Sequence, residues 1–110
     1  MTVETLTRSN FEKEVVNSKV PVIIDFYADW CGPCQMMKPV FEKLSKDFTG
    51  KLNFMRLNTE DEEILAIQFG IQGIPALVVV NDKREVGRIV GYMGEDQLKN
   101  KINEILKKIK

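Results

Sequence analysis

One apolar stretch, Val20 to Ala28, constrains the fold of this chain more than any other feature. Its residues, VPVIIDFYA, are rich in β-branched and aromatic side chains, which favours a strand. They are apolar on both faces, as a central strand covered by helices on both sides of a sheet should be. Pro21 lies near the start, where a strand tolerates proline. Asp25 is the only charged residue in the stretch. We therefore expect an α/β fold built around this strand.

The rest of the chain is predicted to alternate between strands and helices. Apolar periodicity and turn residues predict further strands at 2–6, 52–58, 76–80 and 85–90, and helices at about 9–17, 33–48, 62–69 and 95–110. Ser9 and Glu12 have the spacing of a capping box at the start of the first helix. Strands joined through a helix are expected to run parallel, and the final hairpin should add an antiparallel edge. A length of 110 residues predicts one domain, 1–110, with a mixed sheet between helices.

Composition excludes several classes of function. The 16 basic and 16 acidic side chains give no net charge, which removes the electrostatic basis for binding nucleic acid. The absence of histidine excludes Ser-His and Cys-His nucleophiles and imidazole metal ligands. No apolar run approaches the ~18 residues of a membrane span, and no targeting segment is recognisable. We expect a cytoplasmic protein with no nucleic-acid or membrane partner, no metal and no cofactor.

The two cysteines lie together in the sequence Cys31-Gly32-Pro33-Cys34, between a predicted strand and a predicted helix. Residues i and i+3 at a helix start share one side, so their Cα atoms can approach the ~5.5 Å that a disulfide prefers. The helix N-terminus favours a thiolate at Cys31, and Pro33 fits the first turn because its missing N–H would have no partner there. This arrangement predicts thiol–disulfide exchange, with Cys31 attacking and the more covered Cys34 resolving the mixed disulfide.

Two other interpretations of the cysteine pair are open. A zinc site usually needs four ligands, so two thiols without imidazole would require a dimer or added carboxylates. An inert pair of core cysteines is the second alternative, although a Gly-Pro insert in a loop is a poor place for core packing. The strand–helix setting favours redox chemistry over both.

The segment from Asp25 to Cys34, DFYADWCGPC, resembles the active-site segment of the thioredoxin family, and the Cys-Gly-Pro-Cys unit with its preceding Trp30 is highly specific to it. The resemblance extends over nearly the whole chain through the element order, the sequence GIQGIP at 70–75 and the pair Val90-Gly91. It implies a thioredoxin fold, with a central mixed five-stranded sheet flanked by four helices. It also implies a monomer that reduces disulfides in other proteins. A separate thioredoxin reductase would recycle it, because the chain lacks a glycine-rich nucleotide-binding motif.

Asp25 is a candidate third catalytic residue. Apolar neighbours on both sides predict a buried carboxyl group with a raised pKa, which could exchange a proton with Cys34. The alternative is a structural Asp bonded to backbone or paired with a base. The family resemblance implies the proton-transfer role, with a lysine beside the carboxylate. Arg56 stands at that lysine's position, and its rigid, permanently charged fork is expected to hold the pKa of Asp25 lower.

The resemblance also implies which residues support the cysteines and bind substrate. Trp30, Gly32 and Pro33 would shape the active-site loop. A cis bond before Pro75 would place Ile74 opposite the cysteines, where its backbone would pair with an extended substrate segment. Gly91 would complete the substrate surface with Trp30 and Ile74. Tyr92 stands where the family usually has a small residue, so it is expected to alter the groove and the substrate range.

Two rival functions share this fold. A disulfide oxidase or isomerase would use the same pair in an oxidising compartment, although the Gly-Pro insert, through the resemblance, favours a reductant. A binding or assembly module would carry thiols that are incidental to its activity. Replacing both cysteines with Ser separates the classes, because only a module would stay active.

Overall fold

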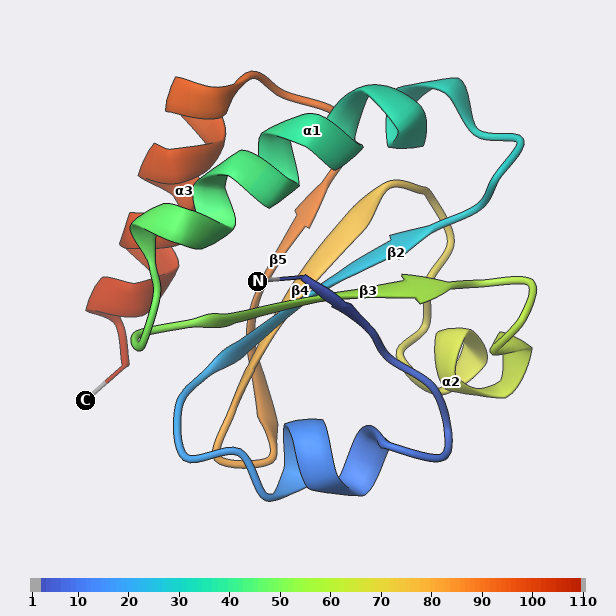
Figure 1. Ribbon diagram of the computed structural model, residues 1–110, viewed down its shortest axis with the longest axis horizontal. Coiled ribbons are helices and arrows are strands. Elements are labelled where there is room, and N and C mark those ends of the chain that lie inside the picture. Colours follow the sequence, from blue (N-terminus) through green and yellow to red (C-terminus); the bar gives the residue numbers. More distant parts are fainter. Residues whose placement is uncertain (1–2, 110) are drawn as a thin grey trace.

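Five strands form one mixed sheet in the computed structural model, which describes residues 3–109 (Figure 1). The strands lie in the order β1-β3-β2-β4-β5. Their bounds are β1 Glu4–Thr5, β2 Val22–Tyr27, β3 Asn53–Asn58, β4 Ala76–Asn81 and β5 Arg84–Val90. The helical elements are η1 Glu12–Val16, α1 Gly32–Asp47, α2 Glu63–Gln68 and α3 Glu95–Lys107. The predicted α/β fold, with a mixed five-stranded sheet and helices flanking it, is confirmed.

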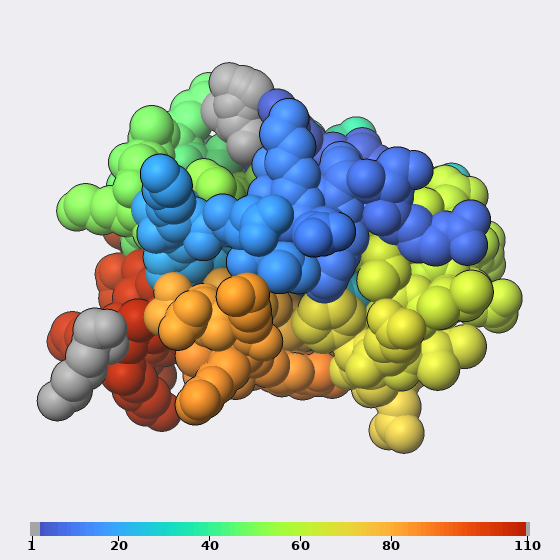
Figure 2. Space-filling view, turned by 90° about the horizontal axis from the view of Figure 1, so that it is seen from below, coloured from blue at the N-terminus to red at the C-terminus, as the bar shows by residue number. Residues whose placement is uncertain are grey.

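The sheet separates two apolar cores. Alternate residues of a strand point to opposite faces, so β2 contributes Ile23 to one core and Ile24 to the other. Figure 1 shows α1 and α3 on one side of the sheet and η1 with α2 on the other. The space-filling view in Figure 2 shows η1, in blue, beside the orange β4–β5 hairpin and the yellow-green α2. Both faces of β2 are therefore covered, as its composition predicts.

The α1 and α3 helices bury the stripes that their periodicity predicts. The apolar residues of α1 and of the position after it follow a helical repeat, and four of them are buried and one is partly buried: Met37, Phe41, Leu44 and Phe48, with Val40. In α3, Leu98 and Ile102 are buried, and Ile105 and Leu106 are partly buried against the same core. These stripes fix both helices on one face of the sheet, which places the N-terminus of α1 at the end of β2.

The direction of β4 differs from the sequence-based expectation. It pairs antiparallel with β2, although a helix separates it from β3. The helix between them does not make a crossover, because the six residues of α2 span only ~9 Å, whereas a six-residue strand spans ~20 Å. The rest of the connection does not carry the chain back along the sheet either, so β4 starts at the end where β3 finishes, as Figure 1 shows. β3 pairs in parallel with β1 and β2, and β4 is the strand that runs against the others, antiparallel to both β2 and β5.

The first helical segment also differs from the prediction. It forms a π-helical turn, and the predicted capping box of Ser9 and Glu12 is wrong, because no side chain caps its N-terminus. The side chain of Asn10 organises the approach instead, with its Oδ1 accepting from the Thr7 backbone N–H at 2.8 Å. The ends of the expected first strand at Thr2 and last helix at Lys110 lie outside the described residues. Among residues 3–109, no helix could cross a membrane.

Candidate functional site

Cys31 and Cys34 form a disulfide at the junction of β2 and α1, with their Cα atoms 5.2 Å apart. Cys31 is the N-cap of α1, and its Sγ accepts a hydrogen bond from the Cys34 backbone N–H at 3.2 Å. Pro33 lies in the first turn of the helix, where no N–H is needed. The Cα spacing predicted for residues i and i+3 at a helix start is confirmed. The helix start therefore suits both states of Cys31: its sulfur can be bonded to Cys34 in the disulfide, or be a free thiolate that accepts the Cys34 backbone N–H.

Access to the pair is limited to one side. Cys31 is 5% exposed and Cys34 is 1% exposed, whereas the side chain of Trp30 is 70% exposed. Gly32 and Pro33 are exposed as well. Cys31 is thus the more accessible sulfur, in the order that the sequence predicts, and a visiting disulfide would have to approach along the surface formed by these exposed residues.

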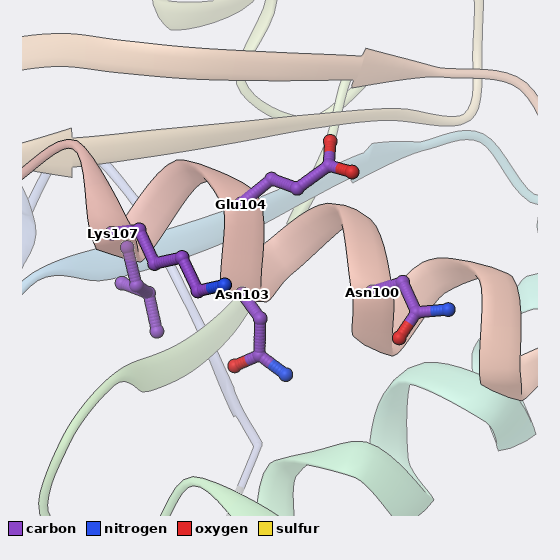
Figure 3. A pocket seen from close by; sticks show the side chains of 5 residues that line it. Asn100, Asn103, Glu104 and Lys107 are labelled. Carbon is purple, nitrogen blue, oxygen red and sulfur yellow. The ribbon is translucent and has the colours of Figure 1, made fainter.

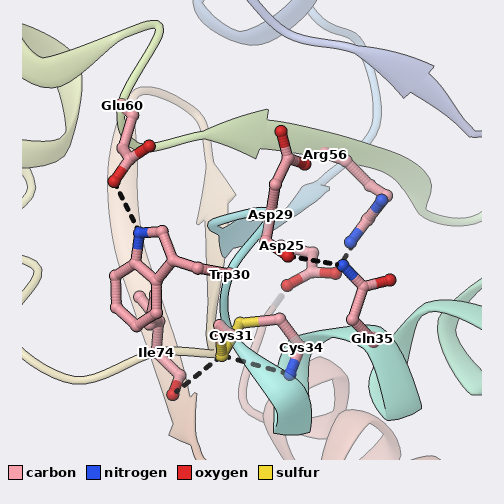
Figure 4. The surroundings of a disulfide bond; sticks show 9 residues. All are labelled: Asp25, Asp29, Trp30, Cys31, Cys34, Gln35, Arg56, Glu60 and Ile74. Atoms are coloured by element: carbon pink, nitrogen blue, oxygen red, sulfur yellow. Dashed lines mark hydrogen bonds and ion pairs between the residues drawn. A yellow bond between two sulfur atoms is a disulfide. The ribbon is translucent and has the colours of Figure 1, made fainter.

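Two polar contacts that the sequence did not predict hold the active-site loop (Figure 4). The Trp30 Nε1–H donates to Glu60 Oε2 at 2.5 Å, which ties the exposed indole to the segment after β3. The Gln35 Nε2–H donates to the Asp29 backbone carbonyl at 2.8 Å across the turn. Trp30 and Glu60 are 30 positions apart, and the pairing of β2 with β3 brings them together, whereas Asp29 and Gln35 meet across the local turn. The loop that carries Cys31 is therefore fixed on both flanks.

Ile74 lies opposite the disulfide, on the loop before β4. The Ile74–Pro75 bond is cis, as the family resemblance implies, and the Ile74 carbonyl oxygen lies 3.9 Å from Cys31 Sγ. Pro75 in turn accepts a hydrogen bond at its carbonyl from the Gly91 N–H at 2.8 Å. Gly91 has φ 97°, a conformation that glycine adopts without strain. Tyr92 follows it and is 42% exposed, on the segment tied to the loop opposite the cysteines.

Asp25 and Arg56 form a buried ion pair set by the sheet register. The two residues are directly opposite each other on β2 and β3, and Arg56 Nε lies 3.1 Å from Asp25 Oδ2. The side chain of Arg56 is only 12% exposed, and its guanidinium carbon lies over the Tyr27 ring, 3.8 Å from the ring centroid. Asp25 Oδ1 is buried and has no hydrogen-bond partner. In Figure 4, Asp25 points from β2 toward the disulfide, with Arg56 on its other side.

Burial determines the ionisation of Asp25. Desolvation raises the pKa of this carboxyl group from 3.8 to about 6, and the nearby charge and hydrogen bond of Arg56 lower it by less. Arg56 pairs with Asp25 as predicted, and its effect on the pKa of Asp25 is in the predicted, downward direction. Arg56 nevertheless does not outweigh burial, so the net pKa stays above the ordinary value. A carboxyl group with a pKa near neutrality can both accept and release a proton under physiological conditions.

Other surface features do not contribute to this site. A shallow hollow on the outside of α3 has Asn100, Asn103, Glu104, Leu106 and Lys107 around it, none of them among the predicted site residues (Figure 3). Within residues 3–109, no group of three or more His, Cys, Asp or Glu side chains is arranged to hold a metal ion.

Comparison with known proteins agrees with this geometry. The family model described as Thioredoxin matches residues 2–104. A thioredoxin of Haemophilus influenzae is 40% identical over 96 residues, which cover 87% of this chain and 90% of that protein. Thioredoxin 1 of a Nostoc species is 36% identical, covering 92% and 94% of the two chains. A thioredoxin of Porphyra purpurea is 31% identical, covering 96% and 99%.

Proposed function

The chain belongs to the thioredoxin family, and from this membership we propose that Cys31 is the attacking thiol and Cys34 the resolving thiol. The protein is a thiol–disulfide oxidoreductase that reduces disulfides in protein substrates. The observation that carries the assignment of roles is the position of Cys31 as N-cap of α1. There its sulfur accepts the Cys34 N–H, and that donor would stabilise a thiolate once the disulfide is reduced.

The exchange proceeds in two balanced steps. In the reduced protein, the Cys31 thiolate attacks one sulfur of a substrate disulfide, forms a mixed disulfide and expels the other substrate sulfur as a thiolate. Cys34 then loses its proton and attacks the Cys31 sulfur, which releases the second substrate thiolate. The substrate gains two electrons, and the chain is left with the Cys31–Cys34 disulfide seen in the structure.

We propose that Asp25 receives the Cys34 proton in the second step. Three features support this role: the carboxyl group points toward the pair, its Oδ1 has no hydrogen-bond partner, and its pKa of about 6 leaves it largely ionised at neutral pH. Arg56 keeps its own charge throughout and holds the other carboxylate oxygen in place, so it is a supporting residue rather than a proton carrier.

Substrate binding is proposed to use the backbone of Ile74. An extended substrate segment would pair with this backbone by strand addition, which brings its disulfide to Cys31 Sγ. Trp30 on one side, and Gly91 with Tyr92 on the other, would contact the flanking residues. The large exposed surface of Trp30 and the partly exposed ring of Tyr92 support this assignment.

The finer features of the biology are proposals from the same family membership. We propose that a separate thioredoxin reductase returns the disulfide to the dithiol, so that the chain carries electrons between that enzyme and its substrates. We further propose that it works as a monomer in the cytoplasm, where the reducing environment favours the dithiol form. The Gly-Pro insert between the cysteines supports a reductant over an oxidase or isomerase.

Trapping the mixed disulfide tests the assigned roles. A Cys34→Ser variant, reduced and mixed with a disulfide-bonded protein, should accumulate a covalent adduct that a dithiol dissolves, because the resolving thiol is missing. The Cys31→Ser variant should form none, since the remaining thiol is almost fully buried. An adduct formed through Cys34 alone, in the Cys31→Ser variant, would show that the roles are reversed.

A further inference from the structure

The loop that carries Ile74 and Pro75 is hydrogen-bonded to β5 at its start and to Gly91, just after β5, at its end, and β5 also lies beside the loop between these points. Arg88 bonds the carbonyls of Phe69 and Gly70 at the loop's start. Between the loop's two ends, the γ1 methyl of Val90 lies close to Gly73, 3.5 Å from where a Cβ on that glycine would stand. Gly91 donates its N–H to the Pro75 carbonyl at the loop's end. β5 therefore lies alongside the loop from the end of α2 to the start of β4.

Arg88 makes the most specific of these contacts. Its Nε and Nη2 each donate to Glu85 at 2.8 Å, to opposite carboxylate oxygens, which fixes the guanidinium plane on the strand. Nη2 also donates to the Phe69 carbonyl at 2.6 Å, and Nη1 donates to the Gly70 carbonyl at 3.4 Å. Four of the five guanidinium N–H groups that arginine offers are used in this way. No other side chain can supply this planar set of donors.

The carbonyls that Arg88 binds need a partner from outside the helix. The last carbonyls of an α-helix have no N–H partner within it, and α2 ends at Gln68 with Phe69 as its C-cap. Phe69 itself is fixed from the other side, because its ring packs against Phe11 and Phe26. Arg88 thus ties the loop's starting point to a ring that is already held in the core.

We propose that Arg88 is a positioning residue for substrate binding, acting through the loop that presents Ile74. This inference rests on the proposed pairing of the Ile74 backbone with substrate. Arg88 and Val90 lie on the same face of β5, with the buried Ile89 between them on the other. The side chains on that face determine the position of the loop, and so the position of the Ile74 backbone relative to Cys31.

The physical benefit is a loop ordered before substrate arrives. Strand addition depends on backbone groups that already point in the required direction, because ordering a mobile segment during binding subtracts from affinity. Releasing the loop from β5 should therefore weaken substrate binding. The chemical step should be unaffected, since neither Arg88 nor Glu85 is among the contacts of the cysteine pair.

The test compares Arg88→Met, which keeps a flexible apolar stem but has no donors, with Arg84→Met. Arg84 is exposed at the start of the same strand, so its replacement removes the same charge from β5 without touching the loop. Arg88→Lys is the third variant, because it keeps the charge but lacks the planar fork. Each variant is assayed for reduction of insulin driven by a fixed concentration of dithiothreitol, and for alkylation of reduced Cys31 by iodoacetamide.

We expect Arg88→Met and Arg88→Lys to raise the KM for insulin about fivefold, as expected for lost hydrogen bonds at a partly exposed site, with kcat and the alkylation rate unchanged. Arg84→Met should match wild type. A KM for Arg88→Met equal to that of Arg84→Met would overturn the proposal, and a wild-type KM in Arg88→Lys would overturn the role of the fork. A protein that was merely less stable would lose kcat instead.

Hydrogen exchange keeps this test separate from the proposed function. The amides of Ile71 and Gly91 are hydrogen-bonded at the two ends of the loop, to Ala66 and Pro75 respectively. Both should exchange faster in Arg88→Met, while the amides of β2 and β3 keep their rates. Unchanged exchange would overturn the positioning role even if the KM of Arg88→Met for insulin rose, because the weaker binding would then not come from a loosened loop. Failure of wild type to reduce insulin would instead refute the proposed function, and exchange would still decide whether Arg88 orders the loop.

Discussion

Replacing Asp25 with Asn removes a buried negative charge while nearly preserving the shape of the side chain. In the folded, oxidised protein, burial raises the pKa of Asp25 to about 6, against 3.8 for an ordinary aspartate. Between these two values the unfolded chain has released its proton and the folded chain still holds it. Folding therefore becomes less favourable as the pH rises through this window, and the loss is complete once the folded form is ionised.

The size of the effect follows from the difference between the two pKa values. A gap of about two pH units, at ~1.4 kcal/mol for each, corresponds to roughly 3 kcal/mol in the free energy of unfolding. Below about pH 4 the carboxyl group is neutral in both states and contributes nothing to this dependence. The stability of Asp25→Asn relative to wild type should therefore increase by about 3 kcal/mol between pH 4 and pH 8. Any loss from leaving Arg56 without a charged partner is the same in the variant at every pH.

Urea unfolding of the oxidised wild type and of Asp25→Asn, measured at steps from pH 4 to pH 8, provides the data. The difference between the two free energies of unfolding should change with a midpoint below or near pH 6 and then stay constant. A difference that did not vary with pH would show that the carboxyl group has an ordinary pKa, and the argument from burial would be wrong. A difference that decreased with rising pH would mean that Arg56 lowers the pKa of Asp25 by more than burial raises it.

Three further expectations follow from the same contacts. Asp25→Ala should slow disulfide reduction at pH 7 by about tenfold or more while weakening folding little, and unchanged kinetics would make Asp25 a structural residue. Arg56→Met should raise the pKa of Asp25 further, because burial is then unopposed; the acidic limb of the pH–rate profile should move to higher pH, and an unmoved limb would contradict this. Gly87→Ala should cost about 1–3 kcal/mol of stability in urea unfolding, because the new Cβ would lie 2.6 Å from Ile105 Cδ1. Reduction of disulfides by the folded variant should be unchanged, and full stability would mean that Ile105 moves freely.

Much of the fold was predictable because local signals agreed with the global arrangement. The apolar stretch around Ile23 and Ile24 predicts a central strand, and the structure covers both of its faces. The Asn81–Lys83 turn predicts a hairpin, and Asp82 and Lys83 adopt the positive φ angles that such turns use. The direction of β4 was not predictable from the rule for helical crossovers, because that rule assumes a helix long enough to return across the sheet.

The first helical segment shows the limit of motif reasoning. Ser9 and Glu12 have the spacing of a capping box, yet Asn10 provides the side-chain hydrogen bonds at this point. Several residues in a row could cap, and the choice among them depends on how the chain leaves β1. Such competition between neighbouring polar side chains is settled by tertiary structure rather than by spacing.

The core of the site was predictable, and its supporting contacts were not. The positions of Cys31 and Cys34 follow from their spacing at a helix start, which is a local property. The bonds from Trp30 to Glu60 and from Arg88 to the end of α2 join residues separated by 30 and 19 positions. Only the order of the strands brings these pairs together, so no local sequence pattern could predict these contacts. The net pKa of Asp25 likewise depends on how deeply the folded sheet buries it.

Reduction of a disulfide-bonded protein, driven by a fixed concentration of dithiothreitol, tests the central claim most directly. The wild-type protein should reduce it well above the rate of the dithiol alone. Cys31→Ser should show only that background, because the attacking sulfur is gone. A wild-type rate equal to the background, or a Cys31→Ser rate equal to wild type, would contradict exchange through the Cys31–Cys34 pair.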